Sequence, residues 1–199
     1  MIIISGPSGA GKSSLCKEAF RQIPNLYFSI SSTTRGIREG EQNGVHYNFI
    51  SVAEFERGIK KGEFLEWAKV HNNYYGTPKS EVAKAQAQGK IIIFDIDVVG
   101  QKSIKAHYKN ATSIFITTPN KAILEARLKE RALDSADTIK RRINGAISEM
   151  QSIENFDFVI INDDFNAALD GFLNIIKATQ FKNNKEFCEN LQKKWSKGI

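Results

Sequence analysis

The residues best suited to chemistry stand at positions 6–13, where the sequence reads Gly-Pro-Ser-Gly-Ala-Gly-Lys-Ser. This matches the pattern G-x-x-x-x-G-K-[ST], whose chemistry is phosphate binding. Glycines let backbone N–H groups turn toward a phosphate, and the helix that follows directs the positive end of its dipole at the same anion. Lys12 can then reach the β- and γ-phosphates, and the Ser13 hydroxyl can help to hold Mg²⁺. An apolar run precedes the motif and a helical pattern follows it, so we predict a nucleoside triphosphate site rather than a glycine-rich turn with a surface lysine.

Two carboxylates, Asp95 and Asp97, come at the end of the apolar run at 91–94. In open α/β sheets ligands gather at the carboxyl ends of strands, and in phosphate-loop proteins an acid there orients Mg²⁺ or its water. The two side chains stand two positions apart, so an extended chain directs both to one side. We expect at least one of them to act at the site. The alternative is that one of them caps the next helix.

The elements that must position these residues follow from the apolar pattern. Short apolar runs at 2–4, 91–94, 113–116 and 158–161 alternate with segments of helical periodicity. Such alternation predicts an α/β fold with a parallel, doubly wound sheet of the P-loop type. Between them, a polar, turn-rich stretch and several short aromatic runs indicate a different, β-rich unit. We therefore predict a core made of residues 1–31 and 83–176, with a small β-rich lobe inserted at 32–82.

Composition narrows the class of protein. The chain has 199 residues, of which 41% are hydrophobic and 25% charged, and its net charge of +6 suits an anionic ligand. No Lys/Arg run suggests a nucleic-acid arm, no apolar stretch approaches the ~18–20 residues of a membrane span, and the first residues do not resemble a signal peptide. Cys16 and Cys188 form no metal-binding pair and fit a reducing compartment. We expect a cytoplasmic protein that binds neither nucleic acid nor membrane.

Further motifs extend over most of the chain. They are Ser-Ser-Thr-Thr-Arg at 31–35 with Arg38, Gly-Val-His-Tyr-Asn-Phe at 44–49, Phe-Leu-Glu-Trp at 64–67, Asn-Tyr-Tyr-Gly-Thr at 73–77 and Ile-Asn-Asp-Asp at 161–164. Together with the phosphate loop and the Asp-Ile-Asp sequence at 95–97, they resemble the guanylate kinase family over residues 1–176. The resemblance implies transfer of a phosphoryl group from ATP to GMP with Mg²⁺, in purine nucleotide metabolism. It also implies a P-loop core, a GMP-binding lobe and a lid, the last within about 120–145.

The resemblance assigns the acceptor nucleotide to one set of residues. The implied GMP-binding residues are Ser31, Arg35, Arg38, Tyr47, Glu66, Tyr75, Thr77 and Asp97. Guanidinium and phenol groups suit a phosphate dianion. Glu66 matches the residue that reads guanine, because a carboxylate accepts from N1–H and from the 2-amino group, whereas adenine has no donor at either place. Thr77 keeps the hydroxyl of the serine that the family often has, and Tyr74 and Tyr75 can alternatively be core aromatics.

The donor nucleotide and the chemistry fall to a second set. The implied ATP-binding residues are Gly6, Ser8, Gly9, Ala10, Gly11, Lys12, Ser13, Ser14, Arg127 and Asn162. The implied catalytic residues are Lys12, Asp95, Arg131 and Arg142, and the implied metal ligands are Ser13 and Asp95. The arginines would neutralise charge on the phosphoryl group during transfer. After Arg131 the lid departs from the family, because Ala132 replaces a common glycine and residues 132–137 carry fewer acids.

Past residue 177 the resemblance fades. Phe181, Phe187, Leu191 and Trp195 recur at near-helical spacing, so a terminal helix either packs on the core or contacts a partner. The oligomeric state is open between a monomer and a homodimer. Two other functions fit part of the pattern. A non-catalytic guanylate-kinase-like module would have lost P-loop or lid residues that this chain keeps, and Glu66 argues against a kinase for another nucleoside monophosphate.

Overall fold

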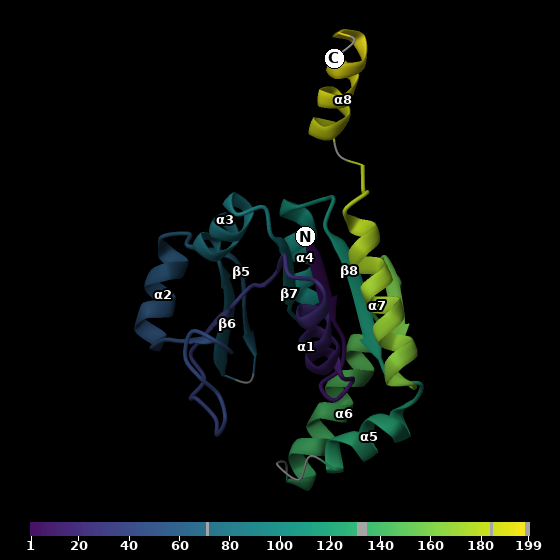
Figure 1. Ribbon diagram of the computed structural model, residues 1–199. Helices are drawn as coiled ribbons and strands as arrows, with labels where there is room; N and C mark the ends of the chain where they lie inside the picture. Colours follow the sequence, from purple (N-terminus) through teal and green to yellow (C-terminus); the bar gives the residue numbers. More distant parts are fainter. Residues whose placement is uncertain (71, 131–134, 184, 198–199) are drawn as a thin grey trace.

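A five-stranded parallel sheet forms the centre of the protein in the computed structural model, which describes residues 1–70, 72–130, 135–183 and 185–197 (Figure 1). In spatial order its strands are β2 (Leu26–Phe28), β7 (Ile91–Asp95), β1 (Ile2–Ser5), β8 (Thr112–Thr117) and β9 (Phe158–Ile161). β1 and β8 are buried along their whole length, which explains their unbroken apolar or small-residue sequences. The predicted parallel α/β fold is confirmed.

Helices cover both faces of this sheet. α1 (Lys12–Gln22) and α7 (Phe165–Thr179) pack on one face, and α3 (Lys79–Ala87) and α4 (Val98–His107) pack on the other. Alternate residues of β1 serve the two layers, since side chains of a strand point in turn to opposite faces. The sheet is therefore doubly wound, and its strand ends are held between two apolar layers.

A second, smaller sheet lies beside the first. Its order is β4 (Asn48–Phe49), β3 (Ser32–Thr33), β6 (Asn73–Pro78) and β5 (Phe64–Val70). All four strands fall inside the segment 32–82. β3 lies in the stretch that we expected to be only polar turns, and it forms because it pairs with both β4 and β6.

The helix α2 (Val52–Lys60) covers the second sheet. It begins with a capping box, in which the Ser51 side chain accepts from the backbone N–H of Glu54 and the Glu54 side chain accepts from the backbone N–H of Ser51. Its buried Phe55 stacks between Phe64 and Tyr74, with ring centroids 4.3 and 5.1 Å away. Tyr74 is thus a packing residue, which agrees with the alternative that it is a core aromatic.

Two helices, α5 (Lys121–Glu130) and α6 (Ala136–Met150), form the predicted lid region at the lower end of Figure 1. They share a small apolar core of their own, made by Leu124, Leu128, Ile143 and Ala146. α6 continues past the predicted boundary at 145, and a short 3₁₀ turn (Ile153–Asn155) then leads into β9. Arg131, and with it residues 132–134 of the atypical lid sequence, lies outside the described residues.

The terminal helix α8 (Lys185–Lys197) extends beyond the body of the protein at the top of Figure 1. Phe181, Phe187 and Trp195 are 90%, 59% and 82% exposed, so the interpretation in which this helix packs its apolar side on the core is wrong. In the described part of the chain, no helix has the length and apolar character needed to cross a bilayer.

Candidate functional site

The phosphate loop connects the end of β1 to the start of α1. Gly6, Gly9 and Gly11 have φ angles of 132°, 95° and 94°, a region that glycine adopts without the strain a Cβ would cause. A Cβ on Gly6 would also lie 2.0 Å from the carbonyl oxygen of Ile116 on β8. The glycines of the motif are therefore required by the backbone of the loop and by its close approach to the neighbouring strand.

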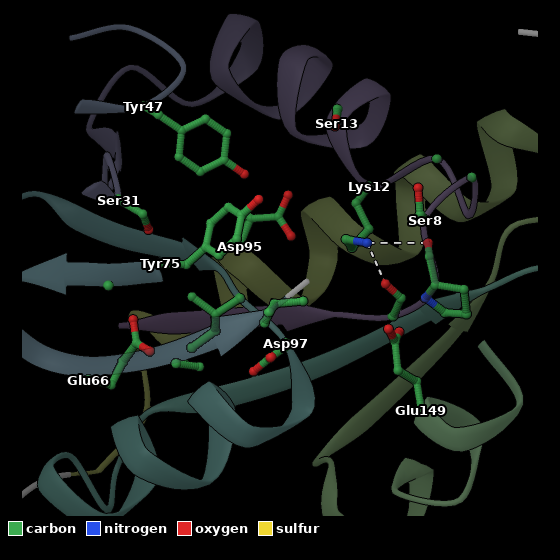
Figure 2. A pocket seen from close by; sticks show the side chains of 18 residues that line it. Ser8, Lys12, Ser13, Ser31, Tyr47, Glu66, Tyr75, Asp95, Asp97 and Glu149 are labelled. Atoms are coloured by element: carbon green, nitrogen blue, oxygen red, sulfur yellow. Dashed lines mark hydrogen bonds between the residues drawn. The ribbon is translucent and has the colours of Figure 1, made fainter. Parts of the chain in front are cut away.

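Lys12, the first residue of α1, folds back over this loop. Its Nζ donates to the carbonyl oxygen of Gly6 and, at 3.3 Å, to that of Pro7 (Figure 2). The side chain of Ser13 faces the same cavity. The cation is thus held at the mouth of the loop, where the motif requires it to meet an incoming phosphate.

One cavity of about 390 Å³ joins the phosphate loop to the second sheet. Its volume is in the range of small-molecule sites. It brings together the predicted site residues Gly6, Ser8, Gly9, Gly11, Lys12, Ser13, Ser31, Tyr47, Glu66, Tyr75, Asp95 and Asp97. In Figure 2, Glu66 and Ser31 lie at one end, Lys12 and Ser8 lie at the other, and Tyr47 and Tyr75 lie between them. Residues far apart in the chain therefore share one chamber with two chemically different ends.

Asp95, the last residue of β7, and Asp97, two positions further on, lie at the middle of the chamber (Figure 2). Burial raises the pKa of Asp95, and the nearby Lys12 cation acts in the opposite direction. Asp97 lines the chamber and also caps α4, because its Oδ1 accepts from the backbone N–H groups of Val99 and Gly100 at 3.1 and 2.7 Å. Asp97 therefore both caps α4 and lies at the site.

Glu66 and Thr77 form the far end of the chamber. They are cross-strand partners on β5 and β6, and Thr77 Oγ1 donates to Glu66 Oε1 at 2.6 Å. Burial raises the pKa of Glu66, and the hydrogen bond from Thr77 lowers it. Thr77 is fully buried and lies behind Glu66 rather than in the chamber wall. The arrangement presents a carboxylate, oriented by a hydroxyl, to whatever fills this end.

Tyr47 and Tyr75 form an aromatic wall between the two ends. Their rings meet edge to face with centroids 6.0 Å apart. Burial raises the pKa of Tyr47, and Asp95 contributes in the same direction. Tyr47 therefore stays neutral near pH 7, and the hydroxyl groups of both tyrosines are of a type that can donate hydrogen bonds to an anion in the chamber.

Arg35 and Arg38 are not brought into the wall of the chamber. Arg35 makes a two-pronged ion pair with Glu41, at 2.9 and 2.8 Å, and its guanidinium lies over the ring of Tyr47, 5.4 Å from the centroid. Arg38 is exposed, and its backbone N–H donates to Glu41 at 2.9 Å. Glu41 thus holds the guanidinium of Arg35 and the backbone of Arg38, and nothing in the local sequence singles it out.

A second pocket, of about 320 Å³, lies on the other side of the phosphate loop. It is lined by Gly9, Gly11, Ser14, Arg127, Glu130, Asn162 and Phe165. Asn162 is buried and donates to the carbonyl oxygen of Ala10 at 2.8 Å. Its Oδ1 is also buried, and no group in the described residues donates to it. The predicted donor-side residues Arg127 and Asn162 thus gather next to the loop.

The helix α6 contributes two side chains near the phosphate loop. Arg142 on α6 donates to Ser8 Oγ at 2.9 Å. Glu149, from the same helix, lines the chamber with Lys12. We identified Arg142 from the sequence but not Glu149, because a single glutamate in a charged helix carries no signal of its own.

Comparisons with known proteins agree on one family. The family profile described as "Guanylate kinase" matches residues 1–179. A guanylate kinase from Helicobacter pylori is 51% identical over 98% of this chain and 95% of its own length. One from Campylobacter jejuni is 44% identical over 100% and 98%. The crystal structure of guanylate kinase from Anaplasma phagocytophilum matches with a TM-score of 0.73 and 30% identity, covering 92% of this chain and 87% of that one.

Proposed function

The chain belongs to the guanylate kinase family of ATP:GMP phosphotransferases, and from this premise we propose that it transfers the γ-phosphoryl group of MgATP to GMP, giving ADP and GDP, as a step of purine nucleotide metabolism. One observation carries the proposal. A single chamber runs from the phosphate loop with Lys12 to the oriented carboxylate of Glu66. A site with a phosphate-binding end and a carboxylate end suits a purine monophosphate placed against a bound triphosphate.

The acceptor end selects guanine. Glu66 accepts from N1–H and the 2-amino group, and the hydrogen bond from Thr77 fixes the direction of the carboxylate. Ser31 lies in the same wall and offers a hydroxyl to the base. Asp97 faces the chamber beside them, near the base and ribose. Adenine would leave the buried carboxylate without a donor, which is costly.

The acceptor phosphate binds to Tyr47, Tyr75, Arg35 and Arg38. The two phenols already face the chamber, whereas Arg35 is paired with Glu41. When a phosphate dianion binds beside the tyrosines, the guanidinium of Arg35 gains a second anion with which it can form two hydrogen bonds. The acceptor oxygen is already ionised near pH 7, so transfer requires positioning and charge stabilisation rather than a strong base.

The donor lies on the phosphate loop, with Lys12 on its β- and γ-phosphates and Arg127 and Asn162 near its adenine. Arg142 stands over Ser8 and, with Arg131, neutralises charge on the group in transfer. Ser13 and Asp95 fit a magnesium site, since both are hard oxygen donors on the chamber wall. Mg²⁺ bound there would reduce the charge of the phosphates. The phosphate oxygens of a bound triphosphate would supply further ligands of the same hard type.

The test is an assay of ADP formation from ATP with GMP, AMP, CMP and UMP in turn. We expect turnover with GMP far above the others. No turnover with any acceptor would support a binding module, and equal turnover with AMP would reject the role of Glu66. Lys12→Ala should lower turnover by about 100-fold or more, while Lys17→Ala, an exposed lysine on the same helix, should leave it unchanged.

A further inference from the structure

Glu149 is the fourth acidic residue in the wall of the chamber, after Glu66, Asp95 and Asp97. It comes from α6 and lines the cavity together with Lys12, Asp95 and Asp97. In Figure 2 its carboxylate points from the lid helix toward the phosphate loop, below Lys12. Burial raises the pKa of Glu149, Lys12 lowers it, and the two aspartates raise it. Its charge is thus felt by the groups that receive the phosphates, yet none of the roles above uses it.

The fold holds Glu149 in this place. Arg142 and Glu149 are seven residues apart, which is about two helical turns, so they lie on one side of α6. Ile143 and Ala146 on the same helix are buried against α5, which fixes the rotation of α6 about its axis. The side of α6 that faces the loop therefore presents a cation to Ser8 at one point and an anion to the chamber at the other.

A fixed negative charge there acts differently on different forms of a nucleotide. A bare triphosphate carries about four negative charges, and a bound divalent cation cancels about two of them. Repulsion from Glu149 is therefore greater for the bare form, and attraction to the cation favours the loaded form. Both effects change the relative affinity in one direction.

We propose that Glu149 is a specificity-determining residue that makes the donor site prefer cation-bound over cation-free nucleoside triphosphate. This inference rests on the proposed donor site. Under this proposal, Glu149 on α6 adds to the preference for the magnesium-bound nucleotide that the metal ligands provide. The same helix thus presents Arg142, a cation for the phosphates, and Glu149, an anion that favours a nucleotide of reduced charge.

The experiment measures binding, without acceptor and without turnover. The affinity of the full chain for the β,γ-imido analogue of ATP is measured by calorimetry, once with excess MgCl₂ and once with EDTA. The quantity of interest is the ratio of the two dissociation constants. We expect Glu149→Gln to reduce the preference for the magnesium form by about tenfold, mainly through tighter binding of the bare form. Glu149→Asp, which keeps the charge, should retain most of the preference.

The matched control is Glu154→Gln, which removes the same charge from an exposed glutamate five residues further along. It should leave the ratio unchanged. An unchanged ratio in Glu149→Gln would overturn the inference, even if the variant also changed thermal stability, because both ligand forms meet the same protein. Failure of the unmodified chain to bind either form would instead reject the proposed donor site.

Discussion

Thr77 Oγ1 and Glu66 Oε1 lie 2.6 Å apart across β5 and β6, and both side chains are buried. The threonine therefore acts on the acceptor end through Glu66. Thr77→Val removes the donor while keeping the shape, so the carboxylate loses a charge-assisted hydrogen bond worth about 1.5–3 kcal/mol. We expect KM for GMP to rise by about tenfold or more and kcat to change less. Steady-state kinetics with varied GMP measures both.

The serine variant separates the hydroxyl from the methyl group. Thr77→Ser keeps the donor, so its KM for GMP should stay close to that of the unmodified chain. A valine variant with an unchanged KM would show that Thr77 has no part in orienting Glu66.

The titration of Glu66 should make the affinity for GMP depend on pH. Because burial raises the pKa of Glu66 above 4.5, the carboxylate takes up its proton at higher pH than an ordinary glutamate does. GMP affinity should then fall as pH decreases toward that raised pKa, and the fall should begin above the usual glutamate range. Calorimetric titration of GMP across this acid range measures it. Glu66→Gln should show weaker binding, by about 10- to 100-fold at pH 7, and no such pH dependence.

The same shift has the opposite consequence for stability. A carboxyl whose pKa is higher in the folded state favours the folded state when protonated, so its contribution is lost as pH rises from its unfolded pKa to its raised folded pKa. Glu66→Gln should therefore raise the melting temperature of the ligand-free protein at pH 7 while weakening GMP binding. A lower melting temperature would mean that the Thr77 contact outweighs the cost of burial.

Arg35 tests the phosphate side of the acceptor. Its guanidinium forms two hydrogen bonds with Glu41 and lies over Tyr47, and a lysine cannot reproduce the two-pronged pairing of the planar guanidinium. Arg35→Lys keeps the charge, so we expect KM for GMP to rise by about tenfold with a smaller loss of kcat. Arg57→Lys, an exposed arginine on α2, is the matched control and should behave like the unmodified chain. Equal KM values for the two variants would contradict the assignment.

Much of the fold could be predicted from sequence because its signals are local. The runs that form β1, β7 and β8 are apolar since both faces of the sheet are covered there, and the phosphate loop is fixed by its own glycines. β9, at the edge of the sheet, is an equally apolar run although only Ile160 of its four residues is buried. β3 could not be predicted in this way. Its two polar residues, Ser32 and Thr33, become a strand only through pairing with β4 and β6, and no short window of sequence contains that information.

The residues of the candidate site also differ in how far the sequence alone could identify them. Residues in motifs, such as Lys12 and Glu66, were found because their neighbours in the chain identify them. Glu41 and Glu149 were missed because their roles depend on groups that the fold brings near them. Glu41 pairs with Arg35, and Glu149 lies in the wall of the chamber beside Lys12. The exposed apolar residues of α8 had two readings, since periodicity predicts a helix but not what covers it.

Gly6 offers a test of the phosphate loop that involves no charge. With a φ of 132° and a Cβ position 2.0 Å from the Ile116 carbonyl oxygen, an alanine there must displace either the loop or β8. We expect Gly6→Ala to lower the free energy of unfolding by about 3 kcal/mol and to abolish nucleotide binding, as measured by urea unfolding and calorimetry. Gly171→Ala is the control, because a Cβ there meets nothing within 4 Å inside α7. It should stabilise the protein by about 0.5–1 kcal/mol. If both variants bound nucleotide alike, the glycine at position 6 would not be a requirement of the site.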